Sequence, residues 1–135
     1  MKEDYVSFEL AKKLKEKGFQ ERSIAYYDNF GVFRFNECTC MSDDCIIDIA
    51  GLMWCHNNKT GGTYIDAPTI AQVLKWLREK QIMVEIPISL MDDGVWCFGF
   101  RIQTKDFYER SINCDYESWE QAALACIKYV LDKII

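Results

Sequence analysis

Apolar residues in the middle of the chain recur at the spacing of one helix face. Ile70, Val73, Leu74 and Leu77 fall at positions i, i+3, i+4 and i+7, which places them in a single stripe on an α-helix. Pro68 comes just before this stripe, and its fixed φ and missing N–H suit the first turn of a helix. The pattern predicts an amphipathic helix that starts near Pro68 and buries one face.

Two further helices are predicted, one near each end of the chain. Ser7 is positioned to cap the first, and Gly18 supplies its stop. Ser118 and Gln121 form a capping-box pattern ahead of the second. The apolar stripes are Val6, Leu10, Ala11 and Leu14 in the first helix, and Trp119, Ala123, Ile127, Val130 and Ile134 in the last.

Two β-hairpins are predicted between these helices. Residues 24–27 and 32–35 are β-prone runs around a turn that contains Asn29 and Gly31, which is typical of a hairpin. Residues 82–90 alternate apolar and polar positions, and this pattern indicates a strand with one buried face.

The second hairpin is completed by residues 96–102, whose aromatic residues alternate in the same way. We expect its apolar side, which includes Ile88 and Leu90, to be covered by helices. Pro87 cannot donate a hydrogen bond to a ladder, so we expect it at an edge or a bulge.

The element order is therefore α-β-β-(β?)-α-β-β-α, the order of an α+β fold. We expect one antiparallel sheet of two hairpins, with one extra strand allowed near residues 46–54, packed by three helices. At 135 residues the chain is expected to form a single domain, residues 1–135, with an irregular cysteine-rich segment at 36–62.

Composition and charge limit the cellular location and the kinds of partner that we expect for this protein. The chain has 21 acidic and 16 basic residues, for a net charge of −5, which disfavours nucleic acid and favours basic partners. Its N-terminal residues show no apolar signal-peptide core, and no run approaches a membrane span. We therefore expect a cytoplasmic protein without membrane contact, in which most of the seven cysteines are reduced thiols.

One cluster has the residue types of a metal site. Cys38, Cys40, Cys45 and either Cys55 or His56 could supply the four ligands that structural zinc takes. The C-x-C start differs from the usual C-x2–4-C spacing, so reduced cysteines in a loop and a strand are the preferred interpretation. No cofactor is expected, and a zinc-binding module is the alternative.

Covalent catalysis is disfavoured because His56 is the single histidine, in a segment without a helix start to lower the pKa of a neighbouring thiol. The chain also lacks a Walker loop, a dinucleotide fingerprint and a paired-carboxylate motif. We therefore predict a non-enzymatic accessory protein that binds an unknown protein partner.

Four aromatic residues are candidates for the surface that meets this partner: Trp76, Tyr26, Tyr27 and Trp54. Trp76 lies beside the stripe of the central helix, where it either anchors a partner or widens the core face. A homodimer is also left open. Weak nucleic-acid binding through helix lysines such as Lys12 and Lys13 is a further alternative, which the acidic start of the last helix disfavours.

Three segments carry a resemblance to a known family. They are MKEDYVSFELAKKLKEKGF (residues 1–19), APTIAQVLKWLREK (67–80) and YESWEQAALACIKYVLDKII (116–135). In this order and at these distances, the chain resembles a family of small uncharacterised phage- and prophage-related proteins of gut Bacteroidetes. The resemblance implies a phage or mobile-element origin and a cytoplasmic location, and it implies no particular reaction.

Overall fold

Among the residues that it describes, the computed structural model has three helices and short antiparallel strands, which confirms the predicted α+β class. It describes residues 4–21, 23–28, 30–35, 45–47, 53–55, 65–106, 108–110 and 115–135. For residues 45–47, 53–55 and 110 the description covers the backbone only. The described residues form two compact units, one within Tyr5–Thr69 and one within Ile70–Ile135. The single domain over residues 1–135 stays a prediction.

Helix α1 (Phe8–Glu16) begins as predicted in the unit within Tyr5–Thr69. The Ser7 Oγ accepts a hydrogen bond from the Leu10 N–H at 3.3 Å, so it satisfies one of the unpaired donors of the first turn. Leu10, Ala11 and Leu14 are buried. The chain leaves the helix through Gly18, whose φ of +93° is open to glycine and strained for other residues.

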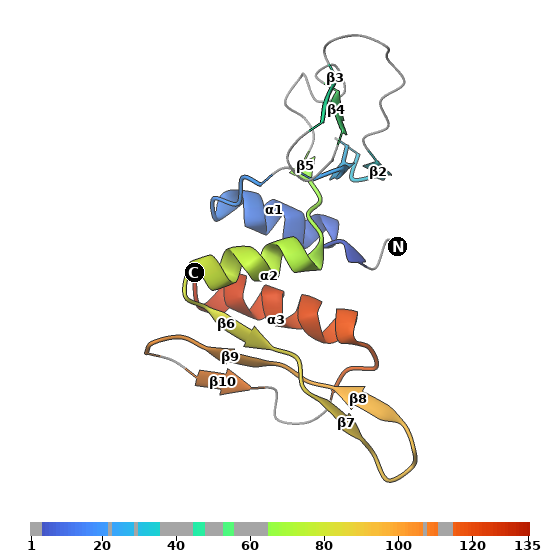
Figure 1. Cartoon of the computed structure of the whole chain (residues 1–135), viewed down its shortest axis with the longest axis vertical. Coiled ribbons are helices and arrows are strands. Elements are labelled where there is room, and N and C mark those ends of the chain that lie inside the picture. The colour runs from blue at the N-terminus through green and yellow to red at the C-terminus, as the bar shows by residue number, and fades with distance from the viewer. Residues whose placement is uncertain are drawn as a thin grey trace. The chain divides into compact units, whose positions relative to one another are not determined.

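The strands of this unit form two separate sheets (Figure 1). β1 (Ala25–Tyr27) pairs antiparallel with β2 (Phe33–Phe35), which is the predicted first hairpin, and also with β5 (Ile65–Asp66). β3 (Cys45–Ile47) and β4 (Met53–Cys55) pair with each other. The turn between β1 and β2 connects two neighbouring strands of the β2-β1-β5 sheet.

Aromatic rings fill the space between α1 and this sheet. Neighbouring rings lie with centroids 5.2–5.8 Å apart in tilted or edge-on pairs, which is a favourable arrangement for aromatic quadrupoles. The hydroxyl of Tyr27 donates to the Val6 carbonyl at 2.7 Å, so its polar end is satisfied inside the core. The rings belong to Tyr5, Phe8, Tyr27, Phe33 and Phe35.

Two helices and a three-stranded sheet build the unit within Ile70–Ile135. α2 (Ile70–Glu79) buries the predicted stripe except Leu74, which is half-buried, and α3 (Trp119–Lys133) packs beside it. β6 (Met83–Glu85), β9 (Arg101–Gln103) and β10 (Tyr108–Arg110) form a sheet in the order β10-β9-β6. The helices and this sheet lie side by side in Figure 1.

Only one face of this sheet is covered. Ile102 is fully buried, and the Phe100 ring lies 6.1 Å from the Tyr129 ring of α3. The Tyr129 hydroxyl also donates to the Glu109 carboxylate of β10 at 3.3 Å. The other face is exposed through Met83, Glu85, Gln103 and Tyr108.

The second predicted hairpin continues beyond this sheet as β7 (Ile88–Leu90) and β8 (Trp96–Phe98). Val84 faces Ile102 and, four residues further along both strands, Ile88 faces Phe98, so both pairs of strands share one register. The regular strand is interrupted at Ile86 and Pro87, in agreement with the edge or bulge expected for that proline.

The predicted burial of Ile88 and Leu90 is wrong. Their exposed fractions are 53% and 57%, and that of Trp96 is 53%, although Ile82 and Ile102 at the other end of the same long hairpin are buried. Because α3 packs over the β9 end of this long hairpin, the β7–β8 end runs past the helices (Figure 1). The alternating pattern predicted the apolar face correctly, and the length of the helix layer decides how much of it is covered.

Replacing Ser118 with alanine is expected to destabilise the fold by about 1 kcal/mol, because the Ser118 Oγ accepts from the Gln121 N–H at 3.1 Å at the start of α3. Chemical denaturation monitored by circular dichroism measures this loss. Ser118→Asp, which keeps a capping oxygen, should stay within a few tenths of a kcal/mol of the parent chain. Equal stability of the parent and Ser118→Ala would show that the cap contributes nothing.

Candidate functional site

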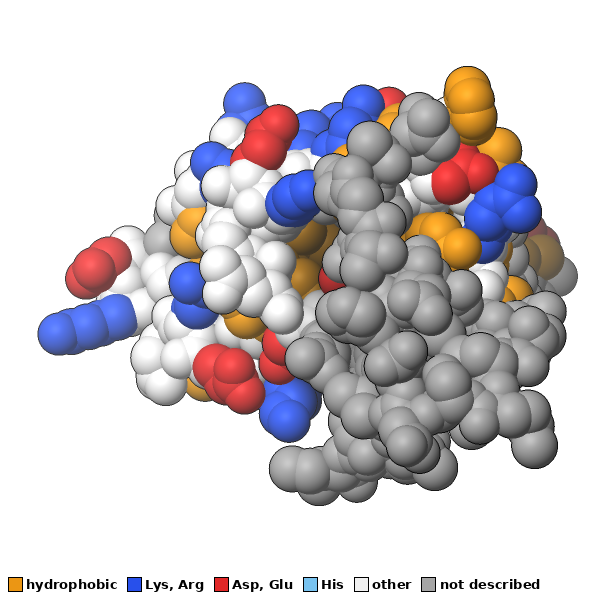
Figure 2. Space-filling view, turned by 90° about the horizontal axis from the view of Figure 1, so that it is seen from above, with side chains coloured by type: hydrophobic (Ala, Val, Ile, Leu, Met, Phe, Trp, Pro, Cys, Tyr) orange, Lys and Arg blue, Asp and Glu red, His pale blue; other side chains and the backbone are white. Residues whose placement is uncertain are grey.

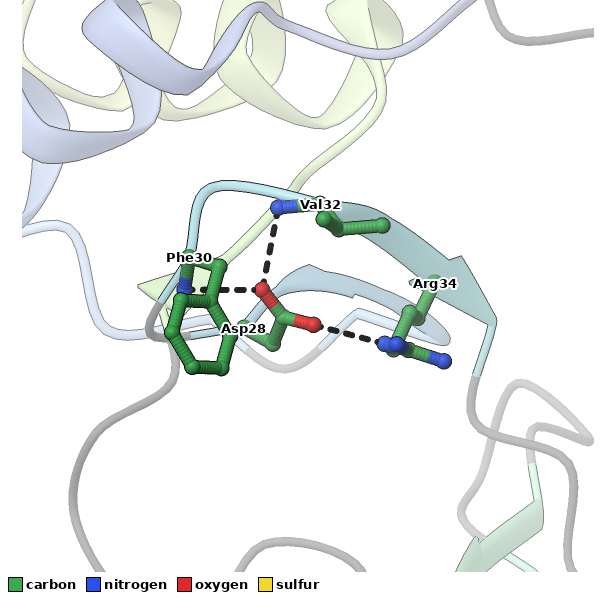
Figure 3. Close-up of polar contacts among 4 residues, drawn as sticks. All are labelled: Asp28, Phe30, Val32 and Arg34. Atoms are coloured by element: carbon green, nitrogen blue, oxygen red, sulfur yellow. Dashed lines mark hydrogen bonds and ion pairs between the residues drawn. The ribbon is translucent and has the colours of Figure 1, made fainter.

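The turn between β1 and β2 is organised by one carboxylate. The Oδ1 atom of Asp28 accepts hydrogen bonds from the Phe30 N–H at 2.9 Å and from the Val32 N–H at 3.0 Å. Its Oδ2 atom accepts from the Arg34 Nε at 2.7 Å (Figure 3). A side-chain oxygen that binds backbone N–H groups two and four residues ahead holds the turn in one conformation.

The backbone of this turn adds two more hydrogen bonds. The Gly31 N–H donates to the Asp28 carbonyl at 2.9 Å, and the Asp28 N–H donates to the Val32 carbonyl at 3.0 Å. Gly31 has a φ of +77°, and a Cβ atom there would lie 3.4 Å from the Phe8 ring. The positive φ therefore favours glycine at this position, and a Cβ atom there would lie in contact with the Phe8 side chain of α1.

This fixed turn presents a large apolar side chain to solvent. Phe30 is 84% exposed, and Val32 beside it is exposed as well. An apolar side chain on an ordered backbone loses little conformational entropy when a partner covers it, so it is well suited to anchor an interface. We call Asp28, Phe30, Gly31 and Val32, with Arg34, the Phe30 turn.

Charge is balanced within the Phe30 turn. The hydrogen bond from Arg34 lowers the pKa of Asp28 below its usual 3.8, and the Val32 and Phe30 N–H groups lower it further. The same hydrogen bond raises the pKa of Arg34. The turn thus presents an apolar tip next to an ion pair whose two charges cancel.

The structure corrects the predicted interaction surface at two of its four residues. Trp76 is 8% exposed, with the Lys80 Nζ 4.7 Å from its ring centroid, and Tyr27 is buried in the aromatic cluster. Trp76 widens the buried stripe of α2, which is the alternative that the sequence left open. Tyr26 is half-buried, and the side chain of Trp54 lies outside the description.

The predicted metal site lies largely outside the described residues. Cys38, Cys40 and His56 are not described, whereas the β3–β4 register places Cys45 directly opposite Cys55. Among the described side chains there is no group of three or more histidine, cysteine or acidic residues that could hold a metal ion. Zinc binding therefore stays a prediction.

The expectation of reduced cysteines is only partly met. Side chains are described for two cysteines, and of these Cys97 on β8 takes part in a disulfide. Cys126 is free and buried in α3, and burial raises its pKa to about 12. Such a thiol stays protonated near neutral pH and makes a poor nucleophile.

Lys12, one of the two lysines named for nucleic-acid binding, is engaged locally on α1. The Lys12 Nζ lies 3.2 Å from the Glu9 carboxylate and 4.6 Å from the Phe8 ring centroid. Figure 2 shows basic and acidic side chains interspersed over the described part of the face that it draws.

In the described part of the chain, no helix has the length and apolarity that a membrane span requires.

The exposure of Phe30 was missed from the sequence, although the turn itself was predicted. A signal was present, since a large aromatic residue inside a turn of Asp, Asn and Gly contributes to neither strand face.

Comparisons of the chain with protein-family models, with curated proteins and with solved structures each found no match.

The pKa of Asp28, followed by NMR titration of its carboxyl carbon, is expected to lie below 3.8 and to rise toward that value in Arg34→Gln. Since a lowered pKa in the folded state means that the ionised carboxylate stabilises the fold, this contribution is complete above about pH 4 and is lost as the pH falls through the folded pKa. The difference in unfolding free energy between the parent and Asp28→Asn should therefore shrink below pH 4. Identical Asp28 titration in the parent and Arg34→Gln would contradict this assignment.

Proposed function

We propose that this protein is a non-enzymatic accessory protein that binds another protein, and that Phe30 is the anchor of the interface. The observation that carries the proposal is the combination of an 84% exposed ring with a turn held by Asp28. A phage or mobile-element origin and a cytoplasmic location rest on the sequence alone and belong to the same proposal.

The shape and charge of the Phe30 turn define the partner. A convex, ordered apolar tip fits a concave apolar pocket, because the ring then leaves water while little of the turn needs to be ordered. The Asp28–Arg34 pair leaves the tip without net charge, and the chain as a whole carries −5, which favours a partner with a basic rim. An anionic membrane surface would repel a chain of this charge.

The absence of catalysis is part of the proposal and rests on the groups that the structure describes. The shifted pKa values of Asp28 and Arg34 follow from their ion pair, and that of Cys126 follows from burial. The pKa values of Tyr27, Tyr116 and Tyr129 are also raised, with burial as the largest cause. Each shift thus has a structural explanation that needs no reacting group.

A photo-crosslinking amino acid at position 30 tests the proposal in cells that express the full chain. We expect a specific crosslinked protein that is absent when the same group replaces the exposed Gln20. With that protein purified, Phe30→Ala should weaken binding on the order of 30-fold, the ratio for a hot-spot loss of about 2 kcal/mol. Phe30→Leu should keep part of the affinity.

Loss of the exposed ring should leave the fold intact, so Phe30→Ala is expected to unfold at the same denaturant concentration as the parent. Equal affinities of Phe30→Ala and the parent for the crosslinked protein would remove Phe30 from the interface. Crosslinks that are equally abundant from positions 20 and 30 would do the same.

A further inference from the structure

The backbone hydrogen bonds of the β7–β8 hairpin show which groups point outward. Along this ladder the Gly99 N–H donates to the Pro87 carbonyl at 3.0 Å, and the Met91 N–H donates to the Val95 carbonyl at 2.9 Å. Hydrogen-bonded and non-hydrogen-bonded pairs alternate in an antiparallel ladder. Ser89 therefore bonds inward to β8, and the N–H and C=O groups of Ile88 and Leu90 point to the outer edge of β7.

The opposite edge of the hairpin confirms this alternation. Phe98 faces Ile88 across the ladder, and its N–H and C=O groups should also point outward. They do, since the Phe98 N–H donates to the Tyr116 carbonyl at 2.9 Å and the Tyr116 N–H donates to the Phe98 carbonyl at 3.1 Å. The β8 edge is thus occupied at Phe98, whereas no described residue pairs with the β7 edge.

The open edge of β7 is short and follows a proline, but it lacks the charged side chains that often protect such edges. Residues 87–91 read Pro-Ile-Ser-Leu-Met and carry no charge, and Pro87 at one end is the single blocking residue. Ile88 and Leu90 are more than half exposed. An uncharged apolar strand with unpaired outward groups is a template for another strand.

The sequence of this edge is complementary to itself. If a two-fold axis passes through Ser89, an antiparallel second copy places Ile88 opposite the second copy's Leu90, and Met91 opposite its Pro87. The outward groups of Ile88 and Leu90 then bond to each other across the axis, and Ser89 meets its own copy in the non-hydrogen-bonded position. Within residues 87–91 no charged residue meets its like, despite the net charge of −5. The nearest like-charged pair in this register is Glu85 opposite the second copy's Asp93, and both residues lie outside β7.

We propose that a second copy of this chain pairs with the β7 edge around a two-fold axis at Ser89, which joins two β7–β8 hairpins into one four-stranded sheet. The apolar pairs and backbone hydrogen bonds involve few residues, so the dimer is weak and reversible, with a dissociation constant on the order of micromolar. This interface lies on β7 and is independent of the Phe30 turn.

Charge variants at the axis test this register by sedimentation equilibrium of the full chain, from about 1 to 300 µM to bracket a micromolar constant. Ser89→Asp and Ser89→Lys each place like charges opposite each other and should weaken self-association at least tenfold. An equimolar mixture of the two variant chains should restore the dimer. The same substitutions at Gln103, which is exposed on β9 away from this edge, are the matched control and should change nothing.

Amide hydrogen exchange of the parent chain provides a test that needs no substitution. The Ile88 and Leu90 amides should exchange rapidly at low concentration and become protected at high concentration, whereas the Ser89 amide should be protected at both. A chain that is monomeric throughout the concentration range overturns the proposal. So does a dimer that tolerates both charges at residue 89, or a mixture of the charge variants that remains monomeric.

Discussion

Burial of one face of the long β6–β9 hairpin beneath α3 is the constraint on which the Ile70–Ile135 unit depends. Phe100 and Ile102 form the buried face, and α3 contributes Tyr129 and a buried stripe of small and branched residues. Apolar area removed from water is the main favourable contribution to such packing. The covered part of the hairpin is held by this packing, whereas Ile88 and Leu90 of β7 and Trp96 of β8 are exposed beyond it.

The unit within Tyr5–Thr69 is held together by different contacts. Its core is a cluster of aromatic rings, and the turn above that core is held by the Asp28 carboxylate and by a glycine that approaches Phe8 closely. Polar contacts here determine the conformation of a surface feature, whereas apolar contacts hold the unit together. The exposed Phe30 ring is the consequence, because the turn directs it away from the core.

The two proposed surfaces differ in the way they would recognise a partner. The Phe30 turn is a single protruding anchor that suits a pocket, and its specificity would come from shape. The β7 edge offers backbone groups and a symmetric run of uncharged side chains, which suits an identical strand. A protein that carries both could present two anchors at once, since a weak dimer raises the effective concentration of the second anchor.

Local sequence determined the helices, their caps and the faces of the strands, because these depend on periodicity and on the side chains of near neighbours. Ser7, Ser118 and the stripe of α2 were predicted for that reason, as was the alternation in residues 82–90. The sequence also located the turn at residues 28–31.

Tertiary structure decided exposure. Tyr27 was a candidate for the partner surface and is buried, while Ile88 and Leu90 were predicted in the core and are exposed. For Trp76 the sequence left a surface and a core position open, and the folded chain places it in the core. Periodicity identifies the apolar side of an element, but burial depends on whether another element reaches that side. The extent of α3 along the hairpin, and the hold of Asp28 on the turn that carries Phe30, are relations between segments that only the folded chain brings together.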